Sequence, residues 1–220
     1  PKRLKTNSTA FSPPEKRLNT DHSKLSRLKR PFMTNIAIFV SGSGTNCENI
    51  IRYFQDSKRA RVSLVVSNKI DAYALVRAHN HGVPTEVWTK DRFSDAAATI
   101  ELLSSYKIDF IVLAGFLLKV PDYLIVAYPQ KIINIHPALL PLHGGKGMYG
   151  HHVHEAVKRD GDTETGITIH YVNEEFDAGK IIFQARVPVL PTDDVAAIEA
   201  KIHTLEQRHF PEVIDSILPE

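Results

Sequence analysis

Short apolar runs alternate with amphipathic segments from residue 35 onward. The runs are rich in valine and isoleucine and cover 35–40, 62–66, 110–115 and 131–135. Such nearly continuous runs are typical of parallel strands covered on both faces. The segments between them carry apolar residues at helical spacing, and the predicted helices span 46–56, 71–81 and 94–106. This alternation predicts an α/β fold with a mostly parallel sheet and right-handed crossovers.

The downstream half of the chain has a different pattern. Residues 166–172 and 179–189 predict two neighbouring strands joined by NEEFDA, at an antiparallel or mixed edge of the sheet. A long C-terminal helix then follows, with Thr192 or Asp193 as its predicted N-cap. Its apolar residues recur every three or four positions and form one stripe, made of Val195, Ile198, Ile202 and Leu205.

The composition fits one globular domain, with or without a tail. Of 220 residues, 43% are hydrophobic and 24% are charged, which is enough to build a core. The single cysteine, Cys47, excludes a disulfide framework and a cysteine-based zinc site, and it suggests a reducing, cytoplasmic location. Cys47 could have a lowered pKa near a helix N-terminus, but we expect a small buried residue. No apolar run approaches the roughly 20 residues that cross a bilayer, so we expect no membrane interaction.

Basic residues are concentrated at the beginning of the chain. Residues 1–32 hold nine Lys or Arg and two acidic residues, a net charge of +7. The rest holds 18 basic and 23 acidic residues, a net charge of −5, which argues against nucleic acid as a partner. Because the first segment is also poor in apolar residues, we predict a basic disordered extension, 1–32, and a domain, 33–220.

Two interpretations of the extension remain open. It is either a basic arm or organelle-targeting segment, or it is upstream material ahead of a natural start at Met33. We favour the second, because the first predicted strand begins almost directly after Met33. Deletion of residues 1–32 is then expected to leave activity intact.

The sequence SGSGTN, residues 41–46, joins the first predicted strand to the first predicted helix. Gly42 and Gly44 permit a tight turn and a close approach of the backbone to a ligand. The amides of Gly44, Thr45 and Asn46 would lie at the helix N-terminus, where phosphate is favoured. The motif is neither a full dinucleotide fingerprint nor a Walker A loop. It indicates either a phosphate site or an ordinary glycine-rich turn.

Candidate chemistry follows the strand at 131–135, in the sequence NIHPALLP (134–141). Asn134 and His136 lie two residues apart, so their side chains share one face at the carboxyl end of the strand, where open parallel sheets bind ligands. Side by side, an amide and an imidazole can hold a developing oxyanion while the imidazole exchanges a proton. The alternative is a buried histidine bonded to the backbone.

A carboxylate would complete this pair. Asp177, in the turn NEEFDAGKI, would raise the pKa of His136 if the two lay close together. The sequence alone does not bring them together, and Asp-Ala-Gly is also ordinary turn chemistry.

The motifs of the chain resemble, in order, those of the phosphoribosylglycinamide formyltransferase family. The matching segments are SGSGTN, SNK (67–69), VLAGFL (112–117), NIHPALLP, GITIHYVNEEFDAG and EQRHFP (206–211), within residues 35–217. The resemblance implies a Rossmann-like formyltransferase fold with helices on both faces of a twisted sheet. It also implies transfer of the formyl group of 10-formyltetrahydrofolate, a consumed co-substrate, to the amine of glycinamide ribonucleotide in de novo purine biosynthesis. The expected partners are these small molecules, and the expected state is a monomer or homodimer.

The resemblance assigns roles to individual residues. The catalytic residues are Asn134, His136 and Asp177, and those that bind the ribonucleotide are Gly44, Thr45, Asn46 and Glu206. The folate-binding residues are Leu117, Leu118, Lys119, Val120 and Asn134, with 174–179 around the pteridine. The chain departs from the family pattern at 117–120, where Leu and Lys replace a frequent Met-Arg, in a longer loop at 142–154, and at His203, where some relatives have lysine. Lys146 in that loop either meets phosphate or the acidic folate tail or is merely solvated, and Arg92 is a weak candidate for a folate contact.

No metal is expected. His151, His152 and His154 would point to different sides of a helix and have no acidic partner at ligand spacing.

The implied reaction begins with attack of the amine on the formyl carbon. Asn134 and protonated His136 stabilise the resulting oxyanion, and Asp177 keeps His136 charged and assists proton transfer to the departing folate nitrogen. Two other classes remain, namely a formyltransferase acting on methionyl-tRNA and a protein that binds a phosphorylated small molecule without chemistry. We favour the ribonucleotide, because the chain ends soon after the long helix and the glycine-rich loop suits a phosphate.

Overall fold

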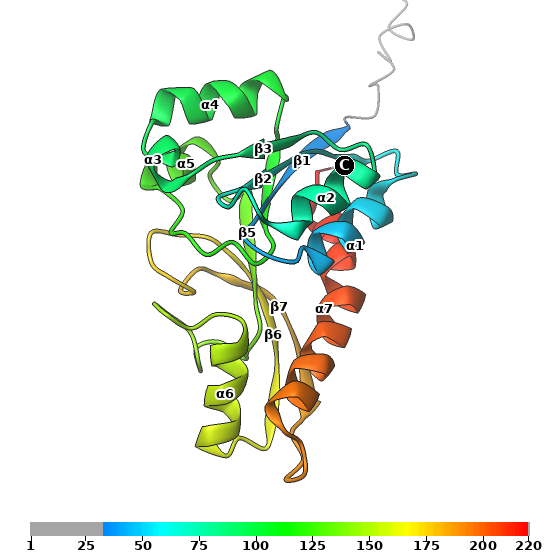
Figure 1. Ribbon diagram of the computed structural model, residues 1–220, viewed down its shortest axis with the longest axis vertical. Coiled ribbons are helices and arrows are strands. Elements are labelled where there is room, and N and C mark those ends of the chain that lie inside the picture. Colours follow the sequence, from blue (N-terminus) through cyan, green and yellow to red (C-terminus); the bar gives the residue numbers. More distant parts are fainter. Residues whose placement is uncertain (1–32, 220) are drawn as a thin grey trace, which may run out of the picture. The chain divides into compact units, whose positions relative to one another are not determined.

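A computed structural model of the protein describes residues 33–219. The predicted extension, 1–32, lies outside the described residues. The described part contains a seven-stranded sheet in the order β3-β2-β1-β4-β5-β6-β7 (Figure 1). The parallel strands are β1 (Thr34–Val40), β2 (Ala60–Ser67), β3 (Thr85–Val87), β4 (Phe110–Leu113) and β5 (Ile132–His136). Strand β6 (Glu164–Tyr171) is antiparallel to β5, and β7 (Ile181–Pro188) is antiparallel to β6, which confirms the predicted edge.

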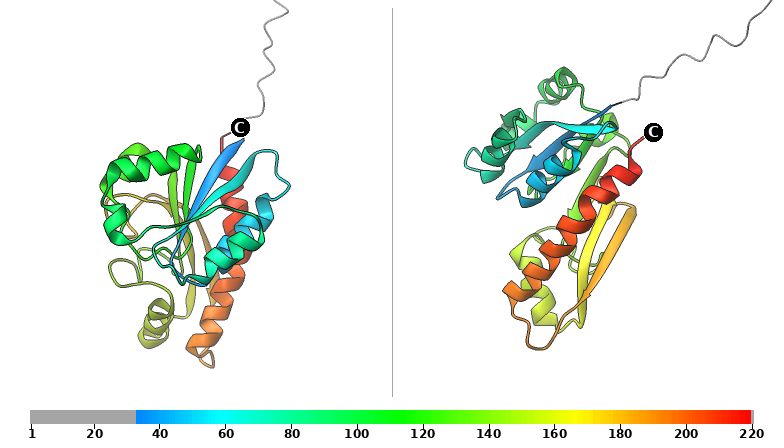
Figure 2. Two further views of the ribbon diagram at one scale, coloured as in Figure 1. Left: turned by 45° about the horizontal axis from the view of Figure 1, so that its top comes forward. Right: turned by 90° about the vertical axis from the view of Figure 1, so that its right-hand side faces the viewer.

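Helices cover both faces of the sheet (Figures 1 and 2). Successive side chains of β1 point to opposite faces, so that Ile36 and Ile38 enter one apolar core while Ala37 and Phe39 enter the other. The first core is closed by α1 (Thr45–Phe54), α2 (Tyr73–Asn80) and the long α7 (Val195–Ile217). The second is closed by α3 (Lys90–Phe93), α4 (Ala96–Ser105) and α5 (Asp122–Ala127). Helix α6 (His151–Asp160) packs against α7.

The beginning of α7 corrects one prediction. Its N-cap is Asp194, whose carboxylate accepts a hydrogen bond of 2.8 Å from the amide of Ala197. The predicted caps, Thr192 and Asp193, are therefore wrong. Asp193 is used differently, because it accepts the amide of Leu190 at 2.8 Å and pairs with Lys201. The predicted apolar stripe is present, since Ile198 and Ile202 are fully buried.

Cys47 lies on the buried face of α1, in the first core. It is fully buried, and burial raises the pKa of its thiol to about 12. The lowered pKa considered from the sequence is therefore wrong, and the expectation of a small buried residue is confirmed. Among the described residues, no helix combines the length and the apolar character that a membrane span requires.

Candidate active site

A cavity of about 690 Å³ opens at the carboxyl ends of β1, β4 and β5. This is the edge at which open parallel sheets bind ligands. Lys146 also lines the cavity, but Arg92 does not. The guanidinium of Arg92 instead lies 4.6 Å from the centre of the ring of Trp88, a residue of the second core. Of the stretch 174–179, Glu175, Phe176 and Asp177 line the cavity, whereas Glu174, Ala178 and Gly179 do not. The residues to which a catalytic or binding role was assigned individually all line it, namely Gly44, Thr45, Asn46, Leu117, Leu118, Lys119, Val120, Asn134, His136, Asp177 and Glu206.

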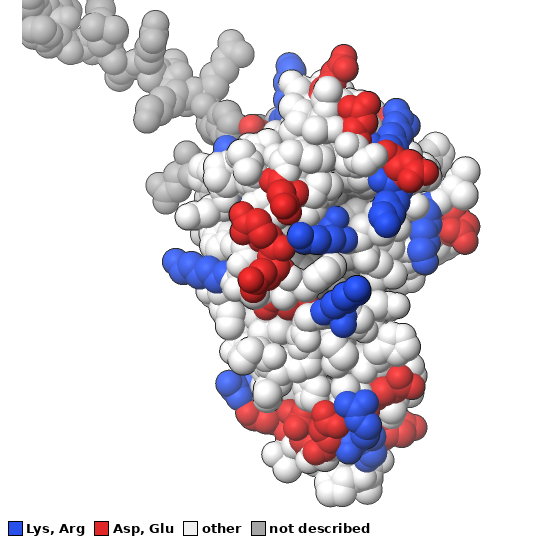
Figure 3. Space-filling view, turned by 90° about the vertical axis from the view of Figure 1, so that its left-hand side faces the viewer, with Lys and Arg blue, Asp and Glu red and all other residues white. Residues whose placement is uncertain are grey.

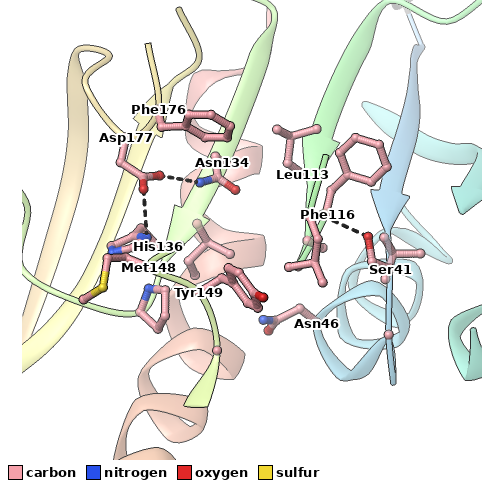
Figure 4. Close-up of a pocket in the computed structure, with 18 of the residues that line it drawn as sticks. Ser41, Asn46, Leu113, Phe116, Asn134, His136, Met148, Tyr149, Phe176 and Asp177 are labelled. Atoms are coloured by element: carbon pink, nitrogen blue, oxygen red, sulfur yellow. Dashed lines mark hydrogen bonds and ion pairs between the residues drawn. The ribbon is translucent and has the colours of Figure 1, made fainter. Parts of the chain in front are cut away.

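The three residues with predicted catalytic roles converge at one side of the cavity (Figure 4). Asn134 and His136 project from β5, and Asp177 reaches them from the turn between β6 and β7. The amide nitrogen of Asn134 lies 3.4 Å from Oδ1 of Asp177, and Nδ1 of His136 lies 3.6 Å from Oδ2. The structure thus brings together three side chains that the sequence separates by up to 43 residues.

A second histidine, which sequence reasoning missed, supports this group. The antiparallel register of β5 and β6 places His170 opposite Asn134. Nδ1 of His170 donates to the carbonyl of Tyr171 at 2.9 Å. Its Nε2 lies 3.2 Å from the amide nitrogen of Asn134 and 3.6 Å from Oδ1 of Asp177, so the ring contacts both of these groups.

Burial and charge oppose each other at His136. The side chain is 3% exposed, and burial lowers the pKa of His136 below its ordinary value. Asp177 raises the pKa of His136, as does the carbonyl of His143, which accepts the Nε2–H at 2.8 Å, but burial outweighs both. The expectation that Asp177 would leave His136 with a raised pKa is therefore wrong.

Asp177 shows the reverse balance. Burial raises the pKa of Asp177, but the neighbouring His170 ring, His136 and the amide of Gly145 together hold it below its ordinary value. The Gly145 amide donates to Oδ2 at 3.0 Å. Asp177 is thus a carboxylate at neutral pH, and it lies beside the imidazole of His136, whose pKa is lowered by burial.

The glycine-rich loop has the geometry of an anion site. Gly44 adopts a left-handed conformation, with φ 77°, and is directly followed by α1. A Cβ atom on Gly44 would lie 2.4 Å from Cβ of Ala74, so only glycine fits against α2. Arg77 of α2 donates to the carbonyl of Ser43 at 3.0 Å. Because Gly44, Thr45 and Asn46 line the cavity, the positive end of the α1 dipole lies at the cavity wall.

Glu206 of α7 connects the glycine-rich loop to His203 of the same helix. It is 6% exposed, and its Oε2 accepts the amide of Asn46 at 3.0 Å and faces Nδ1 of His203 at 3.0 Å. Glu206 raises the pKa of His203, so the carboxylate favours the charged form of this ring beside the loop.

Apolar side chains also line the cavity. Phe176 lies beside Asn134, Leu113 and Phe116 lie toward Ser41, and Met148 and Tyr149 come from the loop before α6 (Figure 4). The hydroxyl of Ser41 accepts the amide of Leu117 at 2.9 Å, which fixes the start of the segment 117–120. Apolar rings flanked by a few directed polar groups suit a flat heteroaromatic ligand.

The histidines of α6 do not gather around a common point. His151 and His152 are exposed and pair with Glu155, whereas His154 is buried and lines the cavity. Within residues 33–219, no cluster of three or more His, Cys, Asp or Glu side chains is arranged to hold a metal ion.

Basic and acidic side chains are interspersed on the face shown in Figure 3, so that neither sign covers it as a continuous patch.

Comparison with known proteins agrees with the fold and the motifs. The family described as formyl transferase matches residues 34–214. The phosphoribosylglycinamide formyltransferase of Haemophilus influenzae is 38% identical over 187 residues, covering 83% of this chain and 86% of the relative. The chloroplastic phosphoribosylglycinamide formyltransferase of Arabidopsis thaliana is 40% identical over 196 residues, covering 86% and 67%.

A solved structure resembles the chain over its described length. The crystal structure of glycinamide ribonucleotide transformylase 1 from Geobacillus kaustophilus superposes with a TM-score of 0.78 at 37% identity, and the match covers 86% of this chain and 100% of that one. The predicted fold is thereby confirmed. The chain belongs to the formyl transferase family.

Proposed function

We propose that the protein transfers the formyl group of 10-formyltetrahydrofolate to the amine of glycinamide ribonucleotide, in de novo purine biosynthesis. The observation that carries this proposal is one cavity with two chemically different ends. Asn134, His136 and Asp177 meet at one end, and the anion-binding loop of Gly44 and Glu206 lies at the other. The relatives named for this activity agree with it.

The ribonucleotide is placed by its charges. Its phosphate accepts the free amides of Gly44, Thr45 and Asn46 at the start of α1. The buried carboxylate of Glu206 accepts hydrogen bonds from the polar groups of the ribonucleotide that lie between the phosphate and the amine. The flat pteridine of the folate lies along the apolar segment 117–120 and the stretch 174–179, so that its formyl group reaches Asn134.

The chemistry follows from this placement. The neutral amine attacks the formyl carbon, and the carbonyl oxygen becomes an oxyanion in a tetrahedral intermediate. The side-chain amide of Asn134 and the ring of His136 stabilise it. The developing negative charge and Asp177 both raise the pKa of His136, so the ring takes up, through water, the proton that the attacking amine releases. The ring then returns this proton through water to the folate nitrogen, the oxyanion collapses to the formamide carbonyl, and the carbon–nitrogen bond to the folate breaks.

The test is an acceptor panel. The full chain is mixed with 10-formyltetrahydrofolate and glycinamide ribonucleotide, and release of tetrahydrofolate is measured. Release with this acceptor supports the proposal. Release only with methionyl-tRNA would assign the chain to another branch of the family, and ligand binding without release would indicate a binding protein.

We further propose a cytoplasmic enzyme with two small molecules as its partners, acting as a monomer or homodimer. The buried, un-ionised thiol of Cys47 fits a reducing compartment. Relatives from bacteria and from a chloroplast carry the same name, so compartment is tested directly by fractionation of the source cells. Light scattering after gel filtration gives the oligomeric state.

A further inference from the structure

A short backbone segment, His143–Gly145, touches both members of the His136–Asp177 pair, and we call it the clamp. The carbonyl of His143 accepts the Nε2–H of His136 at 2.8 Å. Two residues later, the amide of Gly145 donates to Oδ2 of Asp177 at 3.0 Å. The clamp therefore sets which ring nitrogen faces the carboxylate and which carboxylate oxygen faces the ring.

The clamp is packed too closely to shift freely. A Cβ atom on Gly144 would lie 2.5 Å from Cδ2 of Leu140 and 3.4 Å from Cβ of Asp177. His143 itself has a left-handed backbone, with φ 52°, which disfavours any residue other than glycine by roughly 1–2 kcal/mol. Something outside the backbone must therefore hold His143 in place.

The side chain of His143 provides that anchor. Its Nε2 lies 2.6 Å from Oδ2 of Asp162, and because a carboxylate only accepts, the ring donates. Asp162 lies between α6 and β6, on a different part of the chain from the clamp. The Nδ1 atom faces Asp160 at a longer 3.8 Å. Both the ring and Asp162 are mostly shielded from water, which strengthens a charge-assisted hydrogen bond.

We propose that His143 is a positioning residue for formyl transfer, whose ring is anchored on Asp162 and whose carbonyl thereby holds His136 in register with Asp177. The inference rests on the proposed function. The charged or titratable groups that face His136 are Asp177, His170 and His143, and those that face His143 are Asp160 and Asp162.

The clamp has a consequence that can be measured at His136. The carbonyl of His143 accepts the Nε2–H of His136, and the charged carboxylate of Asp177 lies 3.6 Å from Nδ1, so both favour the protonated ring, whereas burial opposes it. Release of the anchor removes the contact to the carbonyl. The pKa of His136 then falls further below its ordinary value, and the ring is more often misplaced during the reaction.

The test breaks the anchor from either side. His143→Gly keeps the left-handed backbone while removing the ring, and Asp162→Ala removes the acceptor. We expect each to lower kcat about 10- to 100-fold, because a small displacement of a catalytic group has effects of this size. The KM for glycinamide ribonucleotide should change less than about twofold. Because both changes break the same contact, the double variant should be no slower than the slower single variant.

A second readout does not depend on activity. NMR titration of the labelled His136 ring should show a lower pKa in both variants than in the unchanged protein. His152→Ala and Asp160→Asn are matched controls, since the first is an exposed histidine of α6 and the second has only the long contact. Both should titrate and turn over like the unchanged protein, and thermal melting checks that every variant is folded.

Two results would overturn the positioning role. One is unchanged kcat and an unchanged His136 titration in His143→Gly, and the other is an equal loss in the two controls. If the unchanged protein transfers no formyl group, the proposed function fails, but the titration of His136 still decides whether the clamp is held by His143.

Discussion

At the scale of single residues, the cavity is organised around a buried imidazole with an acceptor at each nitrogen. Nε2 of His136 donates to a backbone carbonyl, and Nδ1 faces the carboxylate of Asp177 at 3.6 Å. Burial lowers the pKa of His136 below its ordinary value. A nearby oxyanion would reverse this balance, so the ring is arranged to take up positive charge only when negative charge develops beside it.

Asp177→Asn tests this arrangement. The substitution keeps the size of the side chain and removes the charge that supports the imidazolium, so we expect kcat to fall about 100-fold or more. Binding of the ribonucleotide, measured by calorimetry without folate, should change little because Glu206 and the Gly44 loop are intact. Asp56→Asn, on an exposed residue outside the cavity lining, is the control. Turnover close to that of the unchanged protein would exclude Asp177 from the mechanism.

Two other histidines predict the pH dependence of stability, with opposite signs. Burial lowers the pKa of His154, whereas Glu206 raises the pKa of His203. A histidine whose pKa is lowered by folding makes its full contribution to the free energy of unfolding above the unfolded pKa of about 6.5, and this contribution is lost as pH falls. A histidine whose pKa is raised by folding makes its full contribution below about 6.5, and this contribution is lost as pH rises through the folded pKa.

His154→Gln should therefore flatten the decrease in the free energy of unfolding from about pH 7 to pH 5. His203→Gln should instead flatten the decrease above about pH 7. Urea unfolding at several pH values measures both. His136 contributes in the same direction as His154, so some acid sensitivity should persist in His154→Gln. Identical pH profiles for the two variants would contradict the assignment.

Individual site residues could be predicted only where they belong to a local motif. Asn134 and His136 lie two apart on one strand, so their shared face follows from strand geometry alone. His170 and His143 could not be found this way. His170 meets Asn134 through the register of β5 and β6, and His143 acts through its carbonyl and a contact to Asp162, neither of which leaves a sequence pattern.

At the scale of elements, the junction of β1 and α1 shows how closely the loop is packed. Gly44 begins α1 in a left-handed conformation, and its Cα packs against Ala74 of α2. The amide of Ala74 also donates to the carbonyl of Gly42 at 3.2 Å. Helix α2 therefore holds the loop in the shape that exposes the first amides of α1.

Gly44→Ala should disrupt that junction. The left-handed backbone alone costs roughly 1–2 kcal/mol with a side chain present, and the contact with Ala74 adds to this cost. We expect a lower urea midpoint and at least about tenfold weaker binding of the ribonucleotide, as the loop amides move. Gly42→Ala is the stability control, because a Cβ atom there meets nothing within 4 Å. Equal stability of the two variants would show that α2 does not constrain the loop.

The long, buried elements were predictable and the short ones were not. Strands β1, β2, β4 and β5 coincide with apolar runs, because both faces of the sheet are covered. Strand β3 has three residues and α3 has four, which is too short for either periodicity to appear. Helix α6 begins in a run of histidines after a glycine-rich loop, and its buried face is made by Val153, Ala156 and Val157.

At the scale of the molecule, the strand order places the cavity. Because β1 lies between β2 on one side and β4 on the other, the loops after β1 and β4 diverge and leave a crevice at their carboxyl ends. Strand β5 then brings Asn134 and His136 to the same edge. Alternation along the sequence predicts the parallel sheet but not this order, which depends on how the two apolar cores close.

Deletion of residues 1–32 tests whether this segment acts on turnover or on the encounter with substrates. The described residues that line the cavity run from Val40 to Glu206, so we expect deletion of 1–32 to leave kcat unchanged. Both substrates are anions, however, and a segment with a charge of +7 can raise their encounter rate through long-range attraction.

Comparison of the full chain with residues 33–220 therefore needs two ionic strengths. At about 0.15 M salt the Debye length is about 8 Å, so kcat/KM should agree within about twofold. At about 0.01 M salt it is about 30 Å, and any advantage of the full chain should appear in kcat/KM and not in kcat. A large loss of kcat on truncation at both salt concentrations would mean that the segment takes part in the reaction itself.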